Sequence, residues 1–273
     1  MADWKDIGNY AEYTVFAASL AVWLKLLIKG ITGRPPLASV ERPPISWAIP
    51  PVCATFLVAY FLPAFVIERA SPADLRSPEG VLWLQSSEAV PWHVACSLIQ
   101  IVTVVALLRV AGPLRKEDFG CDLTDWRNDV LVGAGGFLAS LAPVFLITML
   151  QHALGWRHLE DKHDFFKILD NDNGSGVVNW VVAAVVVVGP LAEELLYRVL
   201  LQGSVQSQLG GWSILFSTVI FCLRHNPADM LPLVPLALIL GYIYYRRRSY
   251  VALVVAHGLF NAFFITLALM KGG

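Results

Sequence analysis

Long apolar runs separated by short polar segments dominate the chain. A span across the hydrocarbon core of a bilayer needs about 20 apolar residues, and on that scale the pattern predicts eight helices, the sixth and seventh of them short. Their expected ranges are 12–30, 46–67, 91–111, 129–151, 177–201, 212–225, 231–246 and 250–270. The predicted fold is therefore all-α, a polytopic membrane helix bundle of about eight transmembrane helices.

The composition agrees with a membrane protein. Hydrophobic residues make up 56% of the chain and charged residues 15%, with a mean hydropathy of +0.60, whereas soluble domains carry more charge. The net charge of −1 gives no sign of a nucleic-acid partner. No internal repeat is visible, so we expect residues 1–273 to form a single integral membrane domain. The N-terminal residues are acidic, which is opposite to a signal peptide, and the first apolar run is expected to stay as an anchor.

The loops differ in length and charge. The two longest, residues 68–90 and 152–176, are each expected to contain an interfacial helix. Most loop cations follow the first, third and seventh helices, and cytoplasmic loops are enriched in cations. Both termini are therefore expected on the outer side, with residues 246–248 in the cytoplasm. The cations in question are Lys29, Arg34, Arg42, Arg115, Lys116, Arg127, Arg246, Arg247 and Arg248.

Polar residues interrupt the fifth and eighth expected spans and end the sixth. Glu193, Glu194 and Arg198 lie in the fifth, and a carboxylate in the bilayer centre costs roughly 2.5 to 3.5 kcal/mol on insertion scales. The others are His225, His257 and Asn261. Counting along the helices places these groups in the middle or the cytoplasmic half of the membrane. Such residues indicate a functional site by default.

The spacing of these residues predicts how they face one another. Glu194 and Arg198 are four apart and can pair, while Glu193 is rotated by about 100° from its neighbour and points elsewhere. Gly258, beside His257, would let a neighbouring helix approach closely. Taken singly, an ion pair can be a structural tie, a histidine a hydrogen-bonded packing residue, and an asparagine an ordinary helix contact. The combination of these residues is what favours a catalytic site.

Three segments carry a family resemblance. EELLYR (193–198), FCLRH (221–225) and HGLFN (257–261) match, in order, the EExxxR, FxxxH and HxxxN motifs of the CPBP family. The chain resembles the type II CAAX prenyl endopeptidases and the bacteriocin-processing and self-immunity membrane proteins of that family. The likeness covers roughly residues 115–270, which we interpret as the protease core.

The resemblance implies a glutamate-dependent intramembrane endopeptidase. Glu193 and His225 would activate a water, His257 and Asn261 would stabilise the tetrahedral oxyanion, and Glu194 with Arg198 would hold the site in shape. Members of this family have been called metalloproteases, and the glutamate and two histidines (Glu193, His225 and His257) are acceptable zinc ligands. The HExxH signature is absent, so zinc and a metal-free activated water both stay open.

Two functions of different classes follow from these motifs. The first is an endopeptidase that cuts a peptide or protein substrate, lipidated or hydrophobic substrates included, near the cytoplasmic surface of a bacterial plasma membrane. The second is a non-proteolytic bacteriocin-immunity or scaffold protein of the same fold. Because all three motifs are complete, the enzyme is favoured. A transporter is disfavoured, since the repeat symmetry typical of transporters is missing. In each case membrane lipid is the surrounding partner and nucleic acid is not.

Overall fold

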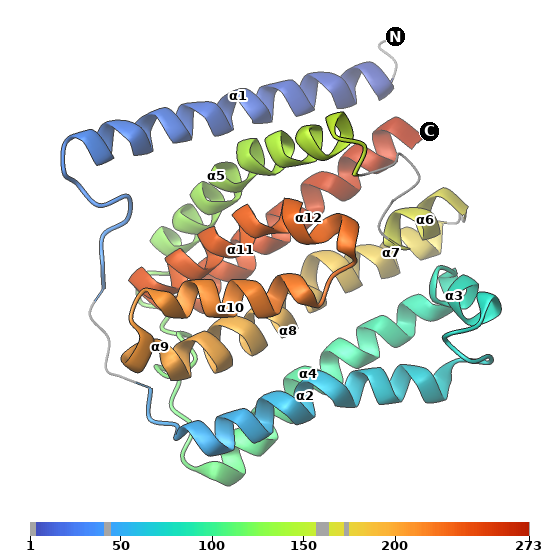
Figure 1. Ribbon diagram of the computed structural model, residues 1–273, viewed down its shortest axis with the longest axis horizontal. Helices are drawn as coiled ribbons and strands as arrows, with labels where there is room; N and C mark the ends of the chain where they lie inside the picture. The colour runs from blue at the N-terminus through green and yellow to red at the C-terminus, as the bar shows by residue number, and fades with distance from the viewer. Residues whose placement is uncertain (1–3, 41–44, 157–163, 172–174, 273) are drawn as a thin grey trace.

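The computed structural model describes residues 4–40, 45–156, 164–171 and 175–272, and within these ranges the fold is entirely helical (Figure 1). The helices of the N-terminal half are α1 (Trp4–Ile31), α2 (Ile49–Ala70), α3 (Pro78–Leu84), α4 (Val90–Ala111), α5 (Trp126–Ala153) and α6 (Asp164–Asn171). Those of the C-terminal half are α7 (Ser175–Val182), α8 (Gly189–Glu193), α9 (Gly203–Leu209), α10 (Trp212–Leu223), α11 (Pro227–Arg247) and α12 (Tyr250–Gly272). The polytopic helical bundle predicted from the apolar runs is confirmed.

Seven of the expected spans are long and apolar enough to cross a membrane in the described part of the chain. The eighth, α10, has only 12 residues and is about 18 Å long at 1.5 Å per residue, too short for a core about 30 Å thick. In chain order α10 is the sixth expected helix and is short, as predicted, whereas the seventh, also expected to be short, is the 21-residue α11. The short helices α3 and α6 form in the two long loops, as expected; Arg42 and residues 172–174 lie outside the described ranges.

The longest helical run, here called the site helix, covers Gly176–Leu209. It contains two π-helical segments, η2 (Ala183–Val188) and η3 (Glu194–Gln202), joined by α8. The predicted end at residue 201 was wrong, because the polar residues beyond it bond to a neighbouring helix rather than forming a loop. π-Helical turns inside helices often occur at functional sites, and η3 begins at one of the two adjacent glutamates.

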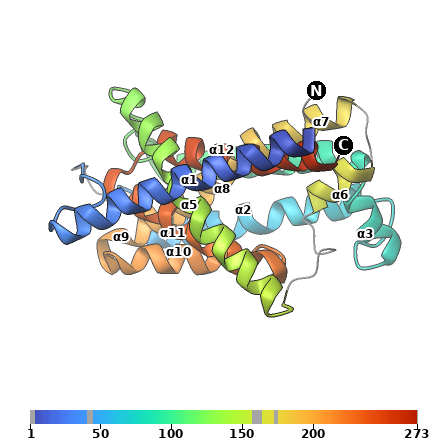
Figure 2. The ribbon, with the colours of Figure 1, turned by 90° about the horizontal axis from the view of Figure 1, so that it is seen from above.

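The site helix is surrounded on several sides. Helices α10 and α11 run beside its C-terminal half, α12 packs along its middle, and the α2–α4 hairpin covers another side (Figures 1 and 2). A single core of apolar side chains connects these helices and includes Leu196, Leu200, Leu240 and Leu253, all fully buried. The polar site is thus enclosed by packed helices.

Helix α1 docks on α5 where a proline breaks the α5 hydrogen-bond ladder. Pro143 has no N–H to give to the carbonyl of Ala139, and the indole N–H of Trp23 donates to that oxygen at 2.9 Å. The hydroxyl of Ser19 donates to Leu138 O at 2.5 Å and accepts from the N–H of Ala142 at 2.9 Å. Two α1 side chains therefore replace the missing bonds and fix the register of an otherwise exposed helix.

The cation-rich loops meet at one end of the bundle. The N–H of Val40 donates to Arg246 O at 2.9 Å, Arg246 Nε donates to Leu37 O at 3.1 Å, and the N–H of Tyr250 donates to Gly120 O at 3.0 Å. These bonds join the loops that follow α1, α4 and α11, and we call this the cationic end. The first turns of α1 and the last turn of α12 lie together at the other end (Figure 1). The shared side of the two termini agrees with the topology predicted from the loops.

We predict that the cationic end faces the cytoplasm. In a protein with its native cysteines replaced, Ser39→Cys and Lys116→Cys, both exposed at that end, should react with a membrane-impermeant maleimide only after cells are broken. Glu88→Cys, exposed at the opposite end, should react in intact cells. The reverse labelling pattern would contradict the positive-inside orientation and place the site nearer the outer surface.

Candidate active site

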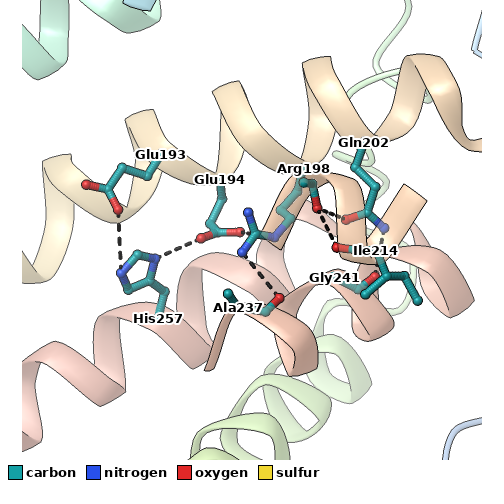
Figure 3. Close-up of polar contacts among 9 residues, drawn as sticks. Glu193, Glu194, Arg198, Gln202, Ile214, Ala237, Gly241 and His257 are labelled. Atoms are coloured by element: carbon teal, nitrogen blue, oxygen red, sulfur yellow. Dashed lines mark hydrogen bonds and ion pairs between the residues drawn. The ribbon is translucent and has the colours of Figure 1, made fainter. Parts of the chain in front are cut away.

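Two adjacent glutamates occupy different surroundings at the junction of α8 and η3 (Figure 3). The Glu194 side chain is 0% exposed, whereas that of Glu193 is 34% exposed. This is the difference expected from their rotation around the helix. Only Glu193 is accessible enough to meet a water molecule or a substrate.

His257 of α12 lies against both carboxylates (Figure 3). Its Nδ1 is 2.8 Å from Glu194 Oε1, and its Nε2 is 3.8 Å from Glu193 Oε2. A carboxylate at one ring nitrogen fixes the proton and the orientation of an imidazole, so Nδ1 carries a proton shared with Glu194. The other nitrogen faces the exposed glutamate across a gap longer than a hydrogen bond.

Arg198 forms the ion pair that its spacing predicts. Its Nε is 3.7 Å from Glu194 Oε2, and both side chains are 0% exposed. The guanidinium also lies 4.9 Å from the centre of the Phe221 ring, a favourable cation–π distance. Glu194 is therefore held between a histidine and an arginine, which compensates a carboxylate removed from all contact with solvent.

A ladder of polar side chains ties the site helix to α11. Side chains four residues apart on the site helix donate to backbone carbonyls four residues apart on α11. The pairs are Arg198 with Ala237, Gln202 with Gly241 and Gln206 with Tyr245, at 3.3, 2.8 and 3.3 Å. The amide oxygen of Gln202 also accepts from Ser217 of α10 at 3.0 Å. A Cβ on Gly241 of α11 would lie 2.8 Å from Ile214 of α10, so these two helices approach this closely only at a glycine.

This ladder was not predicted from the sequence, although a signal for it is present. Gln202 and Gln206 follow Arg198 at intervals of four residues, which places all three on one helix face. Gln202 is fully buried, and polar groups inside a membrane bundle are retained where they bond to a neighbouring helix. The ladder holds the arginine, and through it Glu194, in register with α11.

His225 follows α10 and joins the cluster through Phe221. The fully buried Phe221 ring is centred 4.7 Å from the His225 ring and 6.1 Å from the His257 ring. His225 Nδ1 is 2.9 Å from the carbonyl oxygen of Phe221, which can only accept, so Nδ1 is the donor and Nε2 is the ring nitrogen free to accept when the ring is neutral. Within the described residues no ion pair or hydrogen bond links His225 to Glu193. The FxxxH motif thus aims a half-buried imidazole at the same region.

Asn261 lies one turn beyond His257 on α12 and contacts η2. Its Nδ2 donates to the carbonyl of Val185 at 2.7 Å. One turn earlier, a Cβ on Gly258 would lie 2.9 Å from the carbonyl of Val186, so the close approach expected at Gly258 is present. The HxxxN motif therefore faces the site helix with both of its polar residues, one on each side of α8.

Residues 175–263 match the family model described as type II CAAX prenyl endopeptidase Rce1-like. This segment of the chain is similar to that family, in agreement with the resemblance carried by the three motifs. The match includes all three motifs, from Glu193 to Asn261, and lies inside the predicted protease core at 115–270. The wider core boundary stays a prediction. Among curated proteins and solved structures no significant match was found.

The predicted zinc ligands do not form a ready metal site in the Rce1-like segment. Among the residues that the structure describes, no three His, Cys, Asp or Glu side chains are grouped closely enough to hold a metal ion. Glu193 and His257 approach each other, but His225 is bonded to its own helix. Zinc and a metal-free activated water therefore both stay open.

We predict that Asn261→Ala lowers kcat by about 10² to 10³ with little change in KM, the usual cost of losing one donor to an oxyanion. Thr266→Ala is a matched control, because this exposed α12 side chain bonds only to its own helix, and it should leave both constants unchanged. A rise in KM alone would assign Asn261 to substrate binding. Unchanged kinetics would mean that its bond to Val185 is only a packing contact.

Proposed function

We propose that this protein is an intramembrane endopeptidase that hydrolyses a peptide bond with a water activated by Glu193. The observation that carries the proposal is the contrast between the two glutamates on either side of His257. Glu194 is fully enclosed between His257 and Arg198, whereas Glu193 is partly exposed and, among the residues that the structure describes, has no cation within hydrogen-bond distance. The enclosed Glu194 suits a role in holding the site in shape, and the partly exposed Glu193 suits the role of general base.

In the proposed reaction, Glu193 removes a proton from water while the oxygen attacks the carbonyl carbon of the peptide. His225, with its ring neutral, accepts a hydrogen bond at Nε2 from the second O–H of that water and so orients it, while that hydrogen stays on the oxygen. The proton on Glu193 then passes to the leaving amine when the C–N bond breaks. This sequence leaves the enzyme in its starting state and consumes one water.

The negative charge that develops on the carbonyl oxygen needs a donor placed in advance. His257 supplies one through Nε2 when its ring is doubly protonated, a state that the buried carboxylate of Glu194 favours at Nδ1. Asn261, one turn away, is the second proposed donor. Arg198 balances the charge of Glu194 so that the histidine is held without leaving an excess negative charge in the core.

The proposed substrate is a peptide or protein presented at the cytoplasmic side of the plasma membrane, with a hydrophobic or lipidated end. Seven apolar helices and the family match make this an integral membrane protein. The cluster lies within the apolar bundle near the cationic end, since His257 is seven residues from the start of α12 at Tyr250, about 10 Å along the helix. A substrate with an apolar segment could reach that depth without exposing polar backbone to lipid.

Substrate capture tests this function. Membranes containing the wild-type protein or Glu193→Ala would be compared by cross-linking and by mass spectrometry of peptide termini. We expect the variant to retain one or more membrane peptides uncut, and the wild-type sample to contain the matching new termini. Identical termini in both samples would contradict proteolysis and favour a binding or immunity protein of the same fold.

A further inference from the structure

Arg224 places a second guanidinium beside the site. It directly precedes His225 and follows the end of α10 at Leu223. Phe221, one turn earlier, contacts Arg198 and His257, so Arg224 lies at the depth of the cluster rather than at the end of the bundle. Unlike Arg198, it is exposed at the surface of the helices.

No carboxylate in the described part of the chain pairs with Arg224. Its guanidinium carbon lies 5.7 Å from the centre of the Tyr60 ring on α2. A cation at membrane depth costs several kcal/mol unless it is paired, and intramembrane cations therefore usually serve a function. A weak contact with one ring offsets only part of that cost.

Aromatic contacts link Arg224 to the exposed glutamate. Tyr60 stacks on Phe56 with ring centres 5.8 Å apart, and Phe56 packs edge-on against Tyr197 at 6.2 Å. Tyr197 follows Glu193 by one turn of the site helix, and its ring packs edge-on against Phe221 at 5.3 Å, on the side where Phe221 meets His225. Arg224 and the proposed general base therefore border the same aromatic wall, formed by α2, η3 and the end of α10.

We propose that Arg224 binds a carboxylate of the substrate next to the bond that is cut. A guanidinium offers a planar fork that matches a carboxylate with two parallel hydrogen bonds, and the Tyr60 ring would hold that fork flat. The carboxylate is either the C-terminal group of the peptide or an acidic side chain. The proposal rests on the proposed function, which makes the molecule bound by Arg224 a substrate. Binding of a carboxylate can nevertheless be measured without turnover.

The test uses three fluorescent, N-lauroylated apolar tetrapeptides: one with a free C-terminus, one amidated, and one amidated with an internal glutamate. Dissociation constants would be measured for the wild type and for Glu193→Ala, each with and without Arg224→Gln, in lipid nanodiscs. A charged hydrogen bond contributes enough for about a 10- to 100-fold preference. We expect that preference for a carboxylate probe over the plain amide, and its loss in Arg224→Gln.

Two further variants keep the outcome clear. Arg69→Gln removes a similarly exposed arginine over a phenylalanine ring at the far end of α2 and should leave the preference intact, while Arg224→Lys should retain part of it. The free-acid and glutamate probes show which carboxylate is bound. Equal binding of all three probes, no binding of any, or a preference that persists in Arg224→Gln would overturn the proposal. Because dissociation constants rather than turnover are measured, these results are independent of whether the protein is a protease.

Discussion

Glu193→Ala is expected to abolish detectable turnover while membrane insertion and yield stay close to those of the wild type. General-base catalysis contributes about 10² to 10⁴ in rate, and the site offers no second carboxylate with comparable access, because Glu194 is enclosed between His257 and Arg198. Removing an acid from a membrane helix also relieves an insertion cost. Turnover would be followed as product formed per mole of folded protein.

Glu193→Gln and Glu88→Ala are the comparisons for this result. The glutamine preserves the shape of the side chain but cannot accept the proton of the water, so it should be as inactive as the alanine. Glu88 is an exposed carboxylate outside the cluster, and its loss should have no effect. Activity above a few per cent in either Glu193 variant would reject Glu193 as the base.

Arg198→Ala is expected to have the largest effect on stability. It leaves the fully buried Glu194 without its cation and removes a hydrogen bond to Ala237 O and a contact with the Phe221 ring. Breaking one partner of a buried pair costs about 3 to 5 kcal/mol in soluble proteins. We expect a marked fall in Tm in detergent together with loss of activity, and Arg109→Ala, an exposed cation on α4, should leave Tm unchanged.

A double substitution separates support from chemistry. Replacing Glu194 and Arg198 together by leucine removes both charges, and apolar replacement of a buried pair is often neutral or stabilising. Tm should then recover toward the wild-type value, while activity stays lost because His257 has no carboxylate at Nδ1. If Arg198→Ala kept the wild-type Tm and lost only rate, the arginine would belong to the chemistry.

The fold could be predicted from the sequence wherever the length of an apolar run is enough to identify a membrane span. The long runs identified every full-length span, because about 20 apolar residues are diagnostic of a crossing. The length of the apolar run also indicated a short helix at 212–225, and α10 has 12 residues. Length failed after residue 201, where Gln202 and Gln206 resemble a loop in sequence but bond to carbonyls of α11. These bonds depend on how two distant helices meet, which a local pattern does not contain.

The site was predictable only in part. Spacing of four residues correctly paired Glu194 with Arg198 and separated Glu193 from its neighbour. His257 lies between the two glutamates because α12 packs against the site helix. The spacing of residues within one helix does not indicate such a contact. The π-helical segments were equally invisible, since they are set by packing rather than by a recognisable residue pattern.

The most direct test is cleavage by the purified protein. Wild type, Glu193→Gln and Glu88→Ala would each be reconstituted in liposomes and incubated with a synthetic copy of a captured peptide, and the products identified by mass spectrometry. The account predicts cleavage at one defined bond by the wild type and by Glu88→Ala, and none by Glu193→Gln. Cleavage of the same bond by Glu193→Gln, or an intact peptide with the wild type, would contradict it.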